Sequence, residues 1–121
     1  MTTMPRVTER QFQANVRRVL DMAGWLSFHG WTSVFSPAGY PDICAVRGDR
    51  LLFAELKSAT GKLSPAQITW LDALAEVPGV EVYHWKPDDL EEAGRILYAR
   101  DRPVETPRTS WAAQRPKKEA P

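Results

Sequence analysis

Three residues near the middle of the chain, Asp42, Glu55 and Lys57, have the types and the spacing of a metal-dependent hydrolytic site. Residues 43–46 and 51–56 are strand candidates joined through a Gly-Asp pair, which between two apolar runs is typical of a two-residue hairpin turn. With that turn, Asp42 faces Glu55, and Lys57 shares the face of Glu55 because side chains alternate along a strand. The sequence therefore predicts two carboxylates and an ammonium group converging on one point.

Two facing carboxylates destabilise a sheet unless a proton or a cation lies between them. A hard cation such as Mg²⁺, or Mn²⁺, takes oxygen ligands, and Asp42, Glu55 and the backbone carbonyl of Leu56 would leave positions on it for phosphate and water. Such a site performs phosphodiester chemistry, in which Lys57 could orient or deprotonate the attacking water or neutralise developing charge. The alternative is a pair of solvent-facing charges on an exposed sheet edge.

The elements that would position these residues follow from hydrophobic periodicity and capping signals. The predicted elements are a helix from Thr8 that ends before Gly24, a strand within residues 25–35, the strands 43–46 and 51–56, a helix from Ser64 that stops at Pro78, a strand over 80–85 and a charged helix over 88–100. This order, αβββαβα, indicates an α/β domain.

Length and composition indicate one domain with an ordinary core, because the chain has 121 residues of which 43% are hydrophobic and 26% charged. A single cysteine, Cys44, excludes an internal disulfide and any multi-cysteine metal site. No apolar run reaches the roughly 20 residues needed to cross a bilayer, so a cytoplasmic protein without a membrane partner is expected. Residues 1–100 form the predicted domain, and residues 101–121, rich in proline and charge with Trp111 as their one large apolar residue, are predicted to be a disordered tail.

Pro41-Asp42 followed by Glu55-Leu56-Lys57 resembles the signature of the PD-(D/E)XK nucleases, whose restriction-endonuclease-like αβββαβ core has a mixed central sheet flanked by helices. Within that superfamily, the stretches 39–42, 55–57 and 61–67 are similar to the virus-type replication-repair nuclease domain, VRR-NUC, over about residues 8–86. The resemblance implies a divalent-metal-dependent nuclease that uses Mg²⁺ or Mn²⁺.

The resemblance also carries a glutamate on the first helix and a glutamine on the second, at the positions of Glu9 and Gln67. Glu9 would join the metal ligands, but it also fits the favourable acid of a helix's first turn. Gln67 would lie near the metal water or a phosphate, and it equally fits the Ser64 capping box, so that it could do both. Lys62 is a candidate phosphate contact and Tyr40 a candidate for stacking on a base.

Stand-alone members of the family resemble dimeric resolvases, which implies branched DNA, above all Holliday junctions, as substrate and a homodimer as the assembly. The outer face of the first helix and the edge of the first strand, with Trp31, are the predicted dimer surface. An excess of Lys and Arg over Asp and Glu in residues 1–62 suits a polyanionic partner. The alternatives are a sequence-specific or flap endonuclease that works with a recognition partner, and a non-catalytic DNA-binding module of the same fold.

Overall fold

The computed structural model describes residues 6–30, 37–103 and Trp111. Within them the chain forms an α/β fold whose elements follow the predicted order. They are α1 (Glu9–Met22), β1 (Leu26–His29), β2 (Ile43–Arg47), β3 (Arg50–Leu56), α2 (Pro65–Ala75), β4 (Val80–Trp85), the 3₁₀ turn η1 (Pro87–Asp89) and α3 (Leu90–Tyr98). Strand β1 covers four residues of the predicted 25–35, and residues 31–36 lie outside the described part of the chain. No described helix is long and apolar enough to cross a membrane.

Both predicted capping boxes are present and fix where α1 and α2 begin. At α1 the Thr8 hydroxyl accepts the Gln11 backbone N–H, and Gln11 Oε1 accepts the Thr8 N–H. At α2 the Ser64 hydroxyl accepts the Gln67 N–H at 3.2 Å, and Gln67 Oε1 accepts the Ser64 N–H at 2.8 Å. These boxes satisfy backbone donors that a helix start leaves without partners, so Gln67 is held in the first turn of α2.

The four strands form one mixed sheet in the order β1-β2-β3-β4. Strands β1, β2 and β3 are antiparallel neighbours, and β3 pairs with β4 in parallel across the connection that contains α2. The predicted hairpin register is confirmed, because Arg47 pairs with Arg50 and Ile43 with Ala54. Gly48, in the turn, has a φ of +60°, a conformation that the residue without a side chain adopts at little cost.

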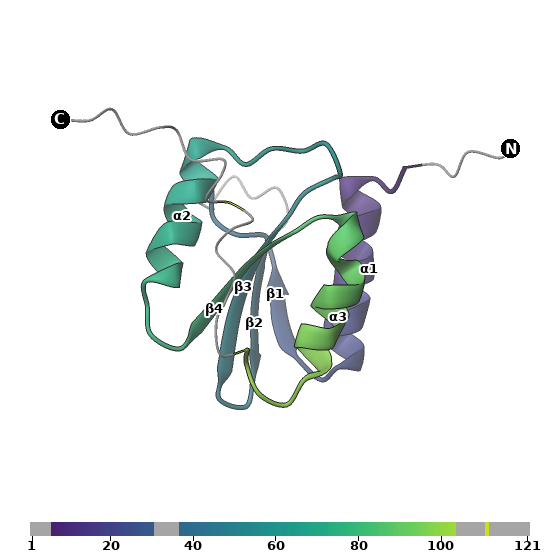
Figure 1. The fold of residues 1–121 in the computed structure, drawn as a ribbon, viewed down its shortest axis with the longest axis vertical. Helices are drawn as coiled ribbons and strands as arrows, with labels where there is room; N and C mark the ends of the chain where they lie inside the picture. Colours follow the sequence, from purple (N-terminus) through teal and green to yellow (C-terminus); the bar gives the residue numbers. More distant parts are fainter. Residues whose placement is uncertain (1–5, 31–36, 104–110, 112–121) are drawn as a thin grey trace, which may run out of the picture.

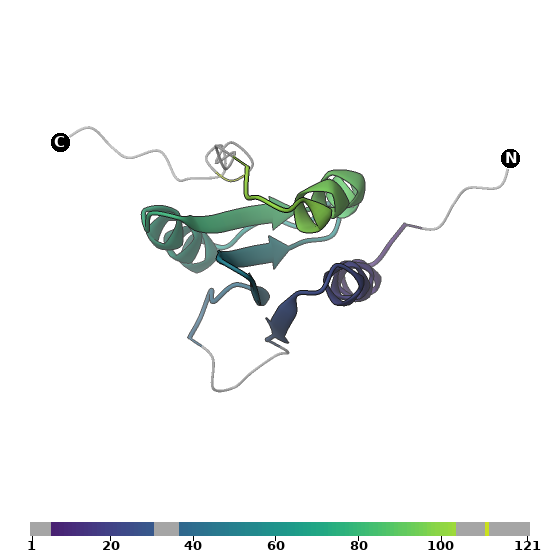
Figure 2. The same cartoon turned by 90° about the horizontal axis from the view of Figure 1, so that it is seen from below.

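The helices cover opposite faces of the sheet. Figures 1 and 2 show α1 and α3 on one face and α2 on the other, beside β3 and β4. Because the hairpin turn lies at the lower end of the molecule in Figure 1, the start of β2, the end of β3 and the start of α1 come together at the upper end. Residues at the start of β2, the end of β3 and the start of α1 are therefore candidates to share one site.

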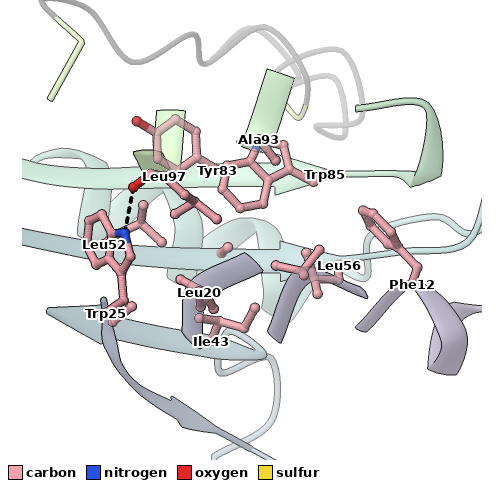
Figure 3. Close-up of a cluster of buried hydrophobic side chains, with 13 residues drawn as sticks. Phe12, Leu20, Trp25, Ile43, Leu52, Leu56, Tyr83, Trp85, Ala93 and Leu97 are labelled. Atoms are coloured by element: carbon pink, nitrogen blue, oxygen red, sulfur yellow. Dashed lines mark hydrogen bonds between the residues drawn. The ribbon is translucent and has the colours of Figure 1, made fainter. Parts of the chain in front are cut away.

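The main core fills the space between the sheet and the pair α1 and α3 (Figure 3). The alternate residues Leu52, Ala54 and Leu56 of β3 face this side, and the indole N–H of Trp25 donates to the Leu97 carbonyl at 2.8 Å. The buried members are Phe12, Val16, Leu20, Trp25, Ile43, Ala45, Leu52, Ala54, Leu56, Tyr83, Trp85, Ala93 and Leu97. This cluster fixes β2 and β3, the two strands that carry the predicted carboxylates.

A second buried cluster lies on the α2 side and corrects the interpretation of Trp111. Its members are Leu63, Ile68, Leu71, Val82 and Trp111. The Trp111 side chain is fully buried, and its indole N–H donates to Asp72 Oδ1 on α2 at 2.9 Å. The proline and charge around Trp111 predicted a disordered tail, but its indole completes a core. The tail residues 104–110 and 112–121 lie outside the described part of the chain.

The hairpin end of the sheet is held by two arginines that lie across from each other. Arg50 forms a buried bidentate ion pair with Glu81, with nitrogen to oxygen distances of 2.9 and 2.6 Å. Arg47 and Arg50 both donate to the Ala99 carbonyl just after α3, and both guanidinium carbons lie 4.8 Å from the centroid of the Trp25 ring. The two arginines therefore tie the β2–β3 turn to the end of α3.

Candidate metal centre

Asp42 and Glu55 meet at the upper end of the β2–β3 hairpin, as the register predicts. Asp42 directly precedes β2, and its backbone N–H donates to Glu55 Oε2 at 3.2 Å. The Asp42 carboxylate in turn accepts the backbone N–H of Leu56 at 2.8 Å. The aspartate side chain thus takes the position of a further ladder acceptor just beyond the last backbone pair, Ile43 with Ala54.

Burial and mutual repulsion act on this carboxylate pair. The side chain of Glu55 is almost entirely buried, and burial followed by the charge of Asp42 raises the pKa of Glu55 from 4.5 to about 8. Burial also raises the pKa of Asp42, although the hydrogen bond from Leu56 opposes that shift. Near neutral pH the pair therefore holds a proton unless a cation replaces it, as expected for two close carboxylates with one shared charge.

Lys57 and Gln67 approach the same carboxylate of Glu55. The Lys57 ammonium nitrogen lies 3.8 Å from Glu55 Oε1, and the Gln67 side-chain N–H donates to that oxygen at 2.7 Å. Gln67 uses its Oε1 for the capping box at Ser64 and its Nε2 for Glu55, so the predicted capping residue also contacts the carboxylate pair. Glu55 is therefore held by the Asp42 backbone, by the Gln67 side chain and by the Lys57 ammonium group.

The backbone of Leu56 supplies a further oxygen on the Asp42 side. Its N–H donates to Asp42, whereas the N–H of the next residue, Lys57, donates across to the Trp85 carbonyl of β4 at 3.0 Å. Because the N–H and the C=O of one residue point to the same side of an extended strand, the Leu56 carbonyl is directed toward Asp42. Two carboxylates and this carbonyl make an oxygen donor set of the kind that Mg²⁺ and Mn²⁺ prefer.

Glu9 lies close enough for its charge to raise the pKa of Asp42, after the larger effect of burial. It is half-buried at the first position of α1. In the described part of the chain, however, no three His, Cys, Asp or Glu side chains are placed to hold one metal ion. Glu9 therefore adds negative potential to the site in this structure without forming a three-carboxylate ligand set with Asp42 and Glu55.

Comparisons of the chain with protein-family models, with curated proteins and with solved structures gave no match. The functional interpretation therefore rests on the site itself.

The two residues predicted to touch nucleic acid have different surroundings. The rings of Tyr40 and Trp70 of α2 lie in a T-shaped arrangement, with 5.1 Å between ring centroids, so the Tyr40 side chain already contacts the protein. Lys62 is exposed in the loop that leads into α2. The Lys62 side chain is thus accessible to solvent, whereas Tyr40 contacts α2.

His84 lies near the site, although no sequence motif indicated it. It is buried in β4, directly beside Glu55 in the parallel register of β3 and β4. A strand pattern by itself does not reveal which residue of β4 lies beside which residue of β3, because the two strands are joined through a helix. The neighbourhood of His84 and Glu55 could be identified only from the folded sheet.

Proposed function

We propose that this protein is a divalent-metal-dependent DNA endonuclease of the VRR-NUC type within the PD-(D/E)XK superfamily. The observation that carries the proposal is the pair of half-buried Asp42 and buried Glu55, whose carboxylates lie together with Lys57 and Gln67 at one end of the sheet. Two acids placed together in the interior destabilise a fold, and groups of this kind cluster at sites that bind a ligand. The order of helices and strands is compatible with this superfamily.

The donor set fits Mg²⁺ or Mn²⁺, with Asp42, Glu55 and the Leu56 carbonyl as the protein ligands. When bound, such an ion supplies Lewis acidity for phosphodiester hydrolysis. Gln67 holds the Glu55 carboxylate in place through the 2.7 Å hydrogen bond, and Glu9 adds attraction for a cation. Lys57 sets a positive charge next to the pair, where it can orient a water or offset charge that develops on the phosphate.

Branched DNA, in particular a four-way junction, is the proposed substrate, and a two-fold homodimer is the proposed assembly. Two identical sites related by a two-fold axis would cut the two strands of one junction symmetrically. Support for a dimer comes from β1, an edge strand whose Leu26 and Phe28 side chains are 79% and 63% exposed. Trp31, also predicted to lie at this surface, falls outside the described residues.

The proposal is tested by incubating the purified protein with end-labelled four-way junction, flap and plain duplex DNA in Mg²⁺, Mn²⁺ or EDTA. We expect metal-dependent cleavage of the junction in paired, symmetric incisions. Asp42→Asn should abolish cleavage, whereas Asp49→Asn, the same change at the far end of the hairpin, should leave it intact.

Two results would contradict the proposal. DNA binding without cleavage under every metal condition would identify a non-catalytic binding module. Equal cleavage by the wild-type protein and the Asp42→Asn variant would move the catalytic centre away from the carboxylate pair. A monomer in light scattering, with and without junction DNA, would remove the resolvase assembly but leave the nuclease assignment in place.

A further inference from the structure

The loop before β2 lies in direct backbone contact with the first turn of α2. Gly39, in this loop, has a φ of +85°. A Cβ atom built on Gly39 would lie 2.4 Å from the carbonyl carbon and 2.5 Å from the carbonyl oxygen of Ala66, and 2.7 Å from the backbone nitrogen of Gln67. These are backbone atoms of a capped helix start, so no side-chain rotation can make room for a methyl group.

This contact joins the two segments that hold Glu55 from either side. The loop leads into Asp42, whose N–H donates to Glu55 Oε2, and the contacted turn of α2 carries Gln67, whose side chain donates to Glu55 Oε1. The hydrogen bond from Gln67 is 2.7 Å long. A shift of the helix start by the width of a methyl group would therefore break it, because hydrogen bonds weaken steeply beyond about 3.2 Å.

A second contact between the same loop and the same helix lies one turn further along α2. The Tyr40 ring meets Trp70 edge to face, and Trp70 is four residues after Ala66, on the same side of the helix. The loop thus follows α2 over two successive positions, at Gly39 through the backbone and at Tyr40 through the side chain. The distance between the loop and α2 is therefore set at Gly39, which has no side chain.

We propose that Gly39 is a positioning residue of the carboxylate site, which lets α2 approach closely enough for Gln67 to hold Glu55 opposite Asp42. Its function in catalysis rests on the proposed nuclease activity, but its effect on the Gln67 contact does not. Replacing Gly39 with any residue that has a side chain should withdraw Gln67 from Glu55 and loosen the metal ligand set. Ligand-orienting contacts of this kind commonly change metal affinity by about 10-fold to 100-fold.

The test compares Gly39→Ala with Gly24→Ala. Gly24 has nearly the same φ, +84°, but a Cβ on it would have no atom within 4 Å, so both variants carry the backbone strain and only Gly39→Ala carries the steric conflict. Two readouts are measured on the full chain: the water exchange of the Gln67 side-chain amide protons by NMR, and the affinity for Mn²⁺ alone by calorimetry. Neither readout requires DNA cleavage.

We expect the Gln67 side-chain amide to be protected in the wild type and in Gly24→Ala, and to exchange freely in Gly39→Ala. The affinity for Mn²⁺ should fall at least about 10-fold in Gly39→Ala relative to Gly24→Ala. In a Gln67→Ala background, Gly39→Ala should cause little further loss, because both changes remove the same contact. Absence of Mn²⁺ binding in the wild type would overturn the proposed metal site, whereas the amide readout would still decide the role of Gly39.

The proposal is overturned if Gly39→Ala and Gly24→Ala show the same Gln67 protection. If Gly39→Ala does not fold, Trp70→Leu decides, because it removes the second loop contact on α2 without backbone strain. Faster exchange of the Gln67 side chain in that variant would support the proposal, and unchanged exchange would overturn it.

Discussion

Without a divalent cation, the stability of this protein should fall as the pH rises from 6.5 to 8. The pKa of Glu55 is raised in the folded state from 4.5 to about 8, by burial first and by the charge of Asp42 second. An acid with a raised pKa binds its proton more tightly in the folded than in the unfolded chain. Its contribution to stability is therefore complete below the unfolded pKa and is lost as the pH rises through the folded pKa.

The magnitude follows from the size of the shift. A change from 4.5 to about 8 corresponds to about 4–5 kcal/mol at 1.36 kcal/mol per unit, of which roughly 1–2 kcal/mol lies between pH 6.5 and 8. This window favours Glu55 over other groups. Burial and then Arg17 lower the pKa of His29 from 6.5, so His29 opposes the effect mainly below pH 6.5 and only weakly above it, and burial keeps the Cys44 thiol protonated by raising its pKa above 9.0.

The assay is urea unfolding at pH 6.5 and pH 8 in EDTA, repeated with saturating Mn²⁺. In EDTA the free energy of unfolding should drop by roughly 1–2 kcal/mol between the two pH values. With Mn²⁺ the drop should vanish or reverse, because the cation takes the place of the proton between the carboxylates. A Glu55→Gln variant should lose the pH dependence in EDTA. Stability that is constant or rises with pH in the metal-free wild type would refute the account of the carboxylate pair.

Lys57→Met should slow DNA cleavage by about 100-fold or more, whereas the affinity for Mn²⁺ should stay equal or increase because a positive charge next to the ligands is lost. Single-turnover kinetics measures the cleavage rate and calorimetry the Mn²⁺ affinity. A parallel loss of metal affinity would argue against a role of Lys57 in the reaction. Trp111→Ala should lower the free energy of unfolding in urea by about 3 kcal/mol, because the ring is 0% exposed, and a loss below about 1 kcal/mol would remove Trp111 from the core. Arg50→Leu should cost about 3–5 kcal/mol in the same assay by leaving Glu81 buried without its partner, and Glu81→Leu added to it should restore much of that loss; a double variant no more stable than Arg50→Leu would contradict this reasoning.

The meeting of Asp42 with Glu55 was predictable because it depends on local chemistry. A two-residue Gly-Asp turn fixes the register of a hairpin, and the register then places residues several positions away. The capping boxes at Thr8 and Ser64 were predictable for the same reason, since each involves residues three apart. These features follow from short segments of sequence without reference to the rest of the fold.

Contacts between distant segments were harder to predict from the sequence. The resemblance to a nuclease family predicted Gln67 near the metal water or a phosphate, but its hydrogen bond to Glu55 was not predicted, because the residues alone gave Gln67 a capping role. No sequence pattern indicated the burial of Trp111, since a single aromatic residue among prolines and charges shows no periodicity. Arg50 is 2% exposed although arginine next to a turn is usually solvated, and its partner Glu81 is on another strand.

The two arginines beside the hairpin turn have a consequence for how the site moves. Hairpins ordinarily open from their ends, but this one is fastened at the turn by Arg47 and Arg50 through the carbonyl groups around Ala99, and at the other end by the contacts of Glu55. Neither end can fray alone without breaking side-chain hydrogen bonds, several of them partly buried. The carboxylate pair therefore lies in a hairpin that is fastened at both of its ends, so that cations and substrate reach it while the hairpin stays closed.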